Sequence, residues 1–254
     1  VIASGSLSSF FRSNGNGLSE SGHANVATPN FVLDYTGAWS KSDDYRAGGG
    51  ARVRSTQYEA QNHAATLSYR NGDQTWSLGY AHQDIPYQGF ANQYMDMLGN
   101  RADTVNLAYG GGFAWGRIDA NAYWHRTKHY MNLLEERVGY VTSSTTGMPM
   151  YVNGEDYGYK VKAEINLSAN DVLRVGNELK LQRMHDYWTP VPGMAPMMCC
   201  DTFQNINDGR RDVVSTFAEW ERQWGGPWST LIGLRNDDVF MNTGRVQGYD
   251  PMMY

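Results

Sequence analysis

The sequence contains no run of about 18 consecutive apolar residues, the length that a membrane-spanning helix requires. It also has little charge of either sign, with 19% charged residues and a formal net charge of -5. The first absence excludes an α-helical membrane protein, and the lack of a basic excess argues against a nucleic-acid partner. With 8 Pro against 28 Gly, and 13% aromatic residues, the composition favours an all-β protein.

Patterns typical of enzyme active sites are missing as well. There is no His-Glu-x-x-His, no Gly-x-Ser-x-Gly and no phosphate-binding loop. Glu135 and Glu136 are adjacent carboxylates, which we expect on a solvated loop turn rather than as an acid and base pair. The sequence therefore predicts a protein that is not an enzyme and holds no catalytic cofactor.

What is present is a series of alternating segments joined by connections of two very different lengths. HAATLSYR (63–70) and QTWSLGYAH (74–82) flank Asn-Gly-Asp, a strong signal for a tight hairpin turn. Further segments of this kind lie at 31–42, 103–110, 116–126, 157–167, 172–183, 213–224 and 228–237. Long connections are expected at 83–100, 127–156 and 184–212, and residues 1–30 are interpreted as one strand and a loop.

These segments predict about ten antiparallel strands in one domain over residues 1–254, with short turns at one end and long loops at the other. Within 159–167, Val161 and Ile165 share one face, and Lys160 and Lys162 share the other. Such alternation is typical of a transmembrane β-barrel with short periplasmic turns and long extracellular loops. It is also typical of a soluble sheet with one solvated side.

The aromatic residues favour the membrane interpretation. One group lies beside the expected short turns: Tyr69, Trp76, Tyr109, Trp115, Trp224 and Trp228. Tyr80 and Trp124 are expected near the opposite strand ends. Aromatic rings are enriched at both surfaces of a membrane, whereas a soluble sandwich would more often bury them mid-strand. We therefore expect a partial transmembrane barrel in contact with the lipid bilayer.

The ends of the sequence suggest a piece of a longer chain. The opening residues lack a charged region followed by a continuous apolar core, so they are not expected to be a signal peptide. They begin as if within a strand, and QGYDPMMY (247–254) stops without a closing element. We expect the chain to be a fragment of the barrel.

The 12 methionines are all expected outside the strand interiors, at the end opposite the short turns. Loops that fold over a barrel mouth need apolar filler, and Met supplies it flexibly. Thioether and thiolate ligands also select copper(I) over hard cations. Because the apolar strand rows do not use Met, the distribution as a whole favours loops that capture copper, with loop packing as the alternative.

His129 and Met131 form a His-x-Met pair near an expected strand end. On a β segment, positions two apart project to the same face, so the imidazole and the thioether could meet one metal ion. The alternative is a surface histidine beside a packed methionine.

A second group of sulfur ligands lies in GMAPMMCCD (193–201). Met197 and Met198 precede the adjacent Cys199 and Cys200. Neighbouring Cα atoms lie about 3.8 Å apart, less than a disulfide normally spans. The cysteines are therefore metal-binding thiolates, a strained vicinal disulfide, or partners of cysteines elsewhere.

Several stretches together resemble the barrel of TonB-dependent receptors, with the closest likeness to the copper-receptor branch. They are SKSDDYR (40–46), GYAHQDIPYQGFANQYMDM (79–97), AYWHRTKHYMN (122–132), LRVGNEL (173–179), DTFQNINDGRRD (201–212), FAEWERQW (217–224) and VQGYD (246–250). The resemblance spans most of residues 31–250 and is most specific from Asp201 to Trp224. It implies a barrel of about 22 strands filled by an N-terminal plug, with uptake driven through the TonB complex.

In the copper receptors, the resemblance implies a His-x-Met pair from the barrel that completes a site with a Cys and a Met supplied earlier. His129 and Met131 match that pair, whereas the Cys-x-x-x-Met element, the plug, the TonB box and the terminal aromatic strand have no match here. We therefore expect part of a bacterial outer-membrane receptor for a scarce nutrient, with a copper ion as the transported ligand. A receptor for an iron chelate (siderophore) and a soluble or surface β-sheet binding module are the alternatives.

Overall fold

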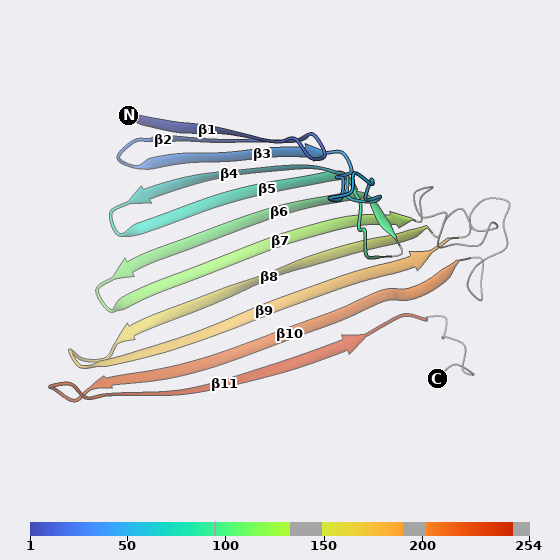
Figure 1. The fold of residues 1–254 in the computed structure, drawn as a ribbon. Helices are drawn as coiled ribbons and strands as arrows, with labels where there is room; N and C mark the ends of the chain where they lie inside the picture. The colour runs from blue at the N-terminus through green and yellow to red at the C-terminus, as the bar shows by residue number, and fades with distance from the viewer. Residues whose placement is uncertain (94, 133–148, 190–201, 246–254) are drawn as a thin grey trace.

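The computed structural model describes residues 1–93, 95–132, 149–189 and 202–245, which form one antiparallel sheet of eleven strands in chain order (Figure 1). The strands are β1 (Ile2–Arg12), β2 (Gly17–Ala27), β3 (Phe31–Ser42), β4 (Tyr58–Asn71), β5 (Gln74–Gln88), β6 (Asp96–Phe113), β7 (Gly116–Asn132), β8 (Met150–Asn166), β9 (Asp171–Trp188), β10 (Phe203–Gln223) and β11 (Ser229–Asn242). The predicted all-β antiparallel fold is confirmed. No helix in these segments is long and apolar enough to cross a membrane.

The strands extend further than the alternation predicted. β5 continues to Gln88, β7 continues to Asn132 and β10 already begins at Phe203. The bounds expected for the three long connections were therefore wrong, because each connection was assigned residues that belong to strands. Met97, Met131, Met150, Met184 and Met241 accordingly lie within strands, although toward the long-connection end as expected.

The first 30 residues also differ from the prediction. They form a hairpin of β1 and β2 rather than one strand and a loop, which raises the number of strands from about ten to eleven. Its turn contains Gly15 and Asn16, both with positive φ (82° and 47°), a conformation that glycine and asparagine tolerate. This short turn lies at the same end of the sheet as the long connections, contrary to the predicted rule (Figure 1).

Register defines two chemically different faces of the sheet, because directly paired residues of antiparallel strands point to the same side. One row of paired residues runs across β3 to β6 and consists of Leu33, Leu67, Leu78 and Leu107. Each of these leucines is about half exposed (47–52%). We call their side the apolar face. The other side is the polar face, on which Asp119 pairs with Lys162.

An aromatic row borders the leucines on the apolar face. The rings of Phe31, Tyr69, Trp76 and Tyr109 follow one another in that order, with centroids 4.6, 5.7 and 5.5 Å apart. The row lies beside the short turns, as predicted for its tyrosines and tryptophan.

The opposite border of the apolar region is charged. Tyr80 donates a hydrogen bond to Asp103 (2.7 Å), and Trp124 donates one to Glu155 (2.6 Å). Both aromatic residues lie mid-strand, not near strand ends as predicted, because β5 and β7 are longer than expected. The next paired row contains His82, Asp103, Arg126, Glu155 and Arg183. On β7 the apolar band therefore ends at Trp124.

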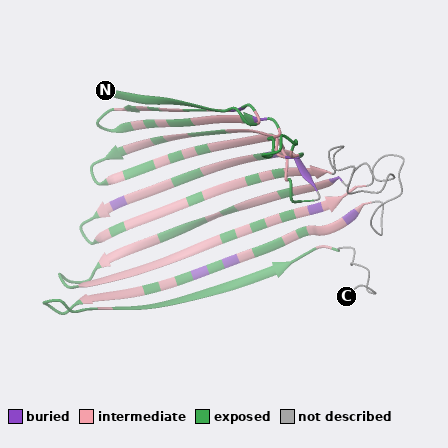
Figure 2. Cartoon of the chain, in the orientation of Figure 1, coloured by how far each residue is buried: buried purple, intermediate pink, exposed green. Residues whose placement is uncertain are grey.

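Little of the sheet is buried (Figure 2). In the described segments the buried hydrophobic residues are Met95, Met97, Phe203 and Val213. Three of these, together with the buried polar residues Asn100, Asp186 and Ser215, lie on the polar face. Crowding of side chains on that side indicates that the sheet curves toward the polar face. In the described segments the leucines of the apolar face remain exposed.

Candidate metal site at the long-connection end

His129 and Met131 lie on the polar face of β7, beyond the apolar band, and share that face as their spacing predicted. Across β6, Asn100 pairs with His129 and Met97 pairs with Met131. These two β6 residues are three positions apart. Both face the same side because a register shift between Met97 and Gly99 inserts an extra residue.

A row of methionines crosses three strands at this position. Met131 pairs with Met97 on one side and with Met150 of β8 on the other. The row continues through Trp188 to Phe203. Paired residues have Cβ atoms about 4.5–5.5 Å apart, and the Met side chain is flexible, so neighbouring sulfur atoms can converge. The register therefore brings three thioethers together beside one imidazole.

A buried carboxylate fixes the connections beside this row. Asp96 is fully buried and accepts hydrogen bonds from the Ser55 hydroxyl and the Phe90 amide, both at 2.8 Å. These bonds tie the connection before β4 to the connection before β6. Met95 and Met97, on either side of Asp96, are buried as a result (8% and 5% exposed).

Side-chain amides hold the ring of His129. Its Nδ1 lies 3.2 Å from Asn100 Oδ1, the Asn100 amide donates to Gln83 Oε1 (3.0 Å), and the Gln83 amide donates to Asn62 Oδ1 (2.8 Å). Because the Asn100 oxygen accepts, Nδ1 carries the proton and Nε2 keeps the lone pair that binds a metal. Burial lowers the pKa of His129, although the negative charge of Asp186 opposes this shift.

Asp186 supplies negative charge close to the ring. In the register it lies two strands from His129, with Val152 between them. It is 7% exposed, and its Oδ2 accepts a hydrogen bond from Asn205 (2.7 Å). Its Oδ1 is buried without a hydrogen-bond partner. A buried carboxylate oxygen without a partner is unfavourable, so a cation at this end of the polar face would be stabilised.

The structure describes only part of the predicted ligand set. It places His129 and Met131 together, whereas Met197, Met198, Cys199 and Cys200 lie outside the described residues. Among the described residues, no group of three or more His, Cys, Asp and Glu could hold a metal ion. A metal site formed by the described residues alone would therefore use thioether sulfur.

Sequence reasoning did not place Met97 and Met150 beside the His-x-Met pair. Met150 was expected in a long connection, yet it is the first residue of β8. Met97 reaches the row only because of the register shift at the start of β6. Met150 is an even number of positions from the polar-face residues of β8, and this spacing could have placed it on that face. The spacing could not have placed Met97, because the register shift interrupts the alternation in β6.

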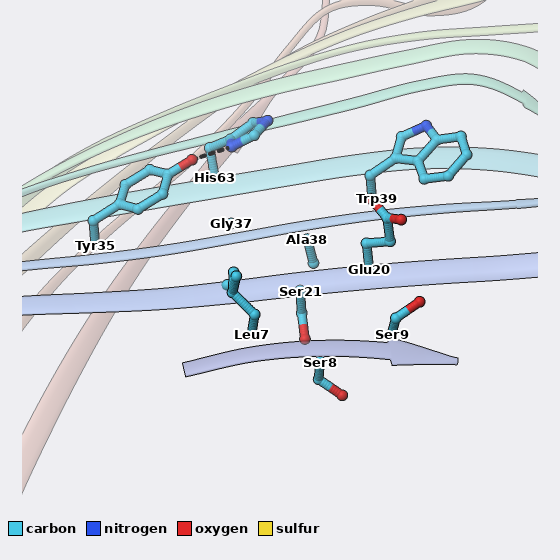
Figure 3. Close-up of a pocket in the computed structure, with 11 residues that line it drawn as sticks. Leu7, Ser8, Ser9, Glu20, Ser21, Tyr35, Gly37, Ala38, Trp39 and His63 are labelled. Carbon is cyan, nitrogen blue, oxygen red and sulfur yellow. Dashed lines mark hydrogen bonds between the residues drawn. The ribbon is translucent and has the colours of Figure 1, made fainter. Parts of the chain in front are cut away.

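A groove of about 540 Å³ lies elsewhere, over β1 to β4 (Figure 3). Gly22 and Gly37 are paired there, and the missing side chains leave the hollow. The Tyr35 hydroxyl and His63 Nδ1 are 2.8 Å apart beside it. These residues are on the apolar face, so this groove is separate from the site around His129.

Neither a protein-family model nor a curated protein matches the chain. Solved structures do match over almost its full length. The copper transporter OprC superposes with a TM-score of 0.77 at 17% identity, over 96% of this chain and 37% of that one. The FrpB iron transporter from Neisseria meningitidis has a TM-score of 0.64 at 16% identity, over 95% and 41% of the two chains. The ferric enterobactin receptor PfeA from Pseudomonas aeruginosa has a TM-score of 0.63 at 15% identity, over 94% and 40%.

This chain thus spans 37–41% of the length of these structures. At such low identity the likeness shows the fold alone. The eleven-stranded sheet is a section of a large antiparallel β-barrel.

Proposed function

We propose that this chain forms part of the barrel domain of a TonB-dependent receptor in the bacterial outer membrane, and that the receptor imports copper. The apolar face of residues 1–254 would contact lipid and the polar face would line the lumen. The TonB complex would drive uptake through a plug domain, as the resemblance in sequence implies. The protein would act as a transporter and not as an enzyme.

The apolar face supports a place in a membrane. Its leucine row lies between the aromatic row and the charged row, which is the order of groups expected from one side of a lipid bilayer to the other. As a soluble binding module, the single-layered sheet would expose Leu67, Leu78 and Leu107 to water together.

Copper as cargo rests on one observation: His129 and Met131 share the polar face with the thioethers of Met97 and Met150 beside them. Soft sulfur ligands with an imidazole suit copper(I), whereas hard cations prefer oxygen. The neighbour OprC, a copper transporter, has a higher TM-score than FrpB and PfeA, which handle iron or an iron chelate. That order is in line with the proposal.

We further propose that Met197, Met198, Cys199 and Cys200 capture copper outside and pass it to the site of His129 and Met131. Thioethers need no proton loss to bind copper, and thiolates bind it tightly. These sulfur ligands precede β10 in the sequence, and β10 begins at the long-connection end of the sheet.

Copper uptake at limiting copper, in cells that carry the full-length receptor, tests the function. Wild type should take up copper, and a His129→Ala/Met131→Ala variant should lose this ability. His125→Ala is the matched control, because both ring nitrogens of this polar-face histidine already contact hydroxyls, of Thr104 and Thr127 at 2.8 Å. A wild-type receptor that takes up an iron chelate and no copper would show that the methionines serve packing.

A further inference from the structure

We infer that the sheet alone supplies a complete four-ligand site for a soft monovalent ion, formed by the sulfur atoms of Met97, Met131 and Met150 and by Nε2 of His129. This inference rests on the proposed copper function and deepens it. The resemblance to copper receptors implies a Cys and a Met from another part of the protein. In this chain, Met97 and Met150 are paired with Met131 on the two neighbouring strands and would take the places of those two ligands.

The strand register places the four proposed ligands next to one another. Met131 is the central residue of the row, with Met97 and Met150 directly paired to it on the two neighbouring strands. His129 is two positions earlier on the same strand and the same face. Met97 and Met150 are therefore each one strand away from Met131, and His129 is the nearest residue on the same face of the same strand. Four side chains around one point are enough for the coordination that copper(I) adopts.

The proposed ligands differ in chemistry from the other residues on the polar face of these strands. Elsewhere, the polar face of β7 and β8 contains charged and hydroxyl groups, such as Asp119, Lys162 and Thr127. Three thioethers beside an imidazole differ from these groups, and this combination suits a soft metal ion. The lone pair of Nε2 is left free because Nδ1 contacts Asn100. Such an arrangement is typical of metal-binding histidines, whose second nitrogen is held by an oxygen acceptor.

The charge of the proposed site favours a monovalent ion. Three thioethers and a neutral imidazole carry no charge, so a bound copper(I) or silver(I) would keep its full positive charge. Asp186, with its buried and unpartnered Oδ1, provides the balancing negative charge two strands from His129. A site of this composition favours a monovalent soft ion over Zn²⁺, which prefers more anionic or nitrogen ligands.

Titration of the purified full-length receptor in detergent with silver(I) and copper(I), against a competing chelator, tests the inference. Met97→Leu and Met150→Leu should each weaken binding by at least about ten-fold, and the double variant by more. Leucine conserves volume, so these variants should fold. Met241→Leu is the control, because Met241 is an exposed polar-face thioether on β11, and it should bind as wild type does.

X-ray absorption of the silver- or copper-loaded receptor provides the structural readout. With Met197, Met198, Cys199 and Cys200 replaced, the receptor should show three sulfur ligands and one nitrogen, and each further single variant should lose one sulfur. Unchanged affinity and sulfur count in the Met97→Leu/Met150→Leu receptor would overturn the inference and leave the proposed copper function standing. A wild-type receptor that binds neither ion would instead overturn the proposed function itself.

Discussion

The imidazole of His129 and the side-chain amide of Asn100 contact each other between β7 and β6, with His129 Nδ1 3.2 Å from Asn100 Oδ1. Asn100 is 9% exposed, and its own amide nitrogen donates to Gln83. Its oxygen must therefore accept from the ring. Because Gln83 is bonded in turn to Asn62, residues on three other strands set the orientation of an imidazole on β7.

Replacing Asn100 should impair metal binding although Asn100 is not a ligand. In an Asn100→Leu receptor the ring loses its acceptor, so the proton is free to move to Nε2. We expect silver(I) or copper(I) affinity to fall by about 10–100-fold, as for other partners of metal-bound histidines. Asn62→Leu, at the far end of the amide chain, should have a much smaller effect. Equal affinities for wild type and Asn100→Leu would show that the contact does not orient the ring.

Metal binding should persist to lower pH than an exposed histidine would allow. Burial lowers the pKa of His129 from its ordinary value of 6.5, and only the neutral ring binds metal. Affinity of the His129 site should therefore fall with acidification at a lower pH than it would for an exposed histidine. Asp186→Asn should move the midpoint to still lower pH, because the carboxylate favours the protonated ring. Titrations of metal affinity against pH locate both midpoints, and a wild-type midpoint above 6.5 would contradict the assignment.

Substitutions on the two faces should separate cleanly in a barrel-folding assay. Val161 and Ile232 lie on the apolar face and are 40% and 60% exposed. Arginine at either position should destabilise the folded barrel by about 2–4 kcal/mol near the bilayer midplane. Lys162→Ala should be mild, because its partner Asp119 keeps an ion pair with Arg117 (2.7 Å). If all three variants unfolded at the same denaturant concentration, the assignment of faces would be wrong.

The sequence predicted the part of the sheet with the apolar face well, because one apolar face and one polar face produce strict alternation along each strand. Beyond Trp124, β7 continues through Arg126 and Lys128 on the apolar face, where polar residues lie on both sides of the strand. Where both faces of a strand are polar, alternation disappears and the strand looks like a loop. The same effect concealed the ends of β5, β8 and β10.

Local irregularities concealed the rest of the site. β5 continues past Pro86 at a register shift opposite Glu59 and Gln61, where proline is tolerated. The shift between Met97 and Gly99 likewise places Met97 beside Met131. Such insertions are defined by the pairing with the neighbouring strand. The alternation of residues along one strand therefore does not reveal them. The His-x-Met pair was visible because both its members lie on one strand.

The sulfur cluster of Met197, Met198, Cys199 and Cys200 should control the rate of copper entry and not the affinity of the deep site. If these residues capture copper outside, a variant with all four replaced should take up copper more slowly at limiting copper and normally when copper is abundant. The site around His129 should keep its silver(I) affinity, because its ligands come from β6, β7 and β8. His129→Ala/Met131→Ala should show the reverse, with the deep site lost and copper uptake impaired at every copper concentration. Two sets of variants with the same uptake and binding defects would mean that the cluster and the His-x-Met pair form one site rather than two in series.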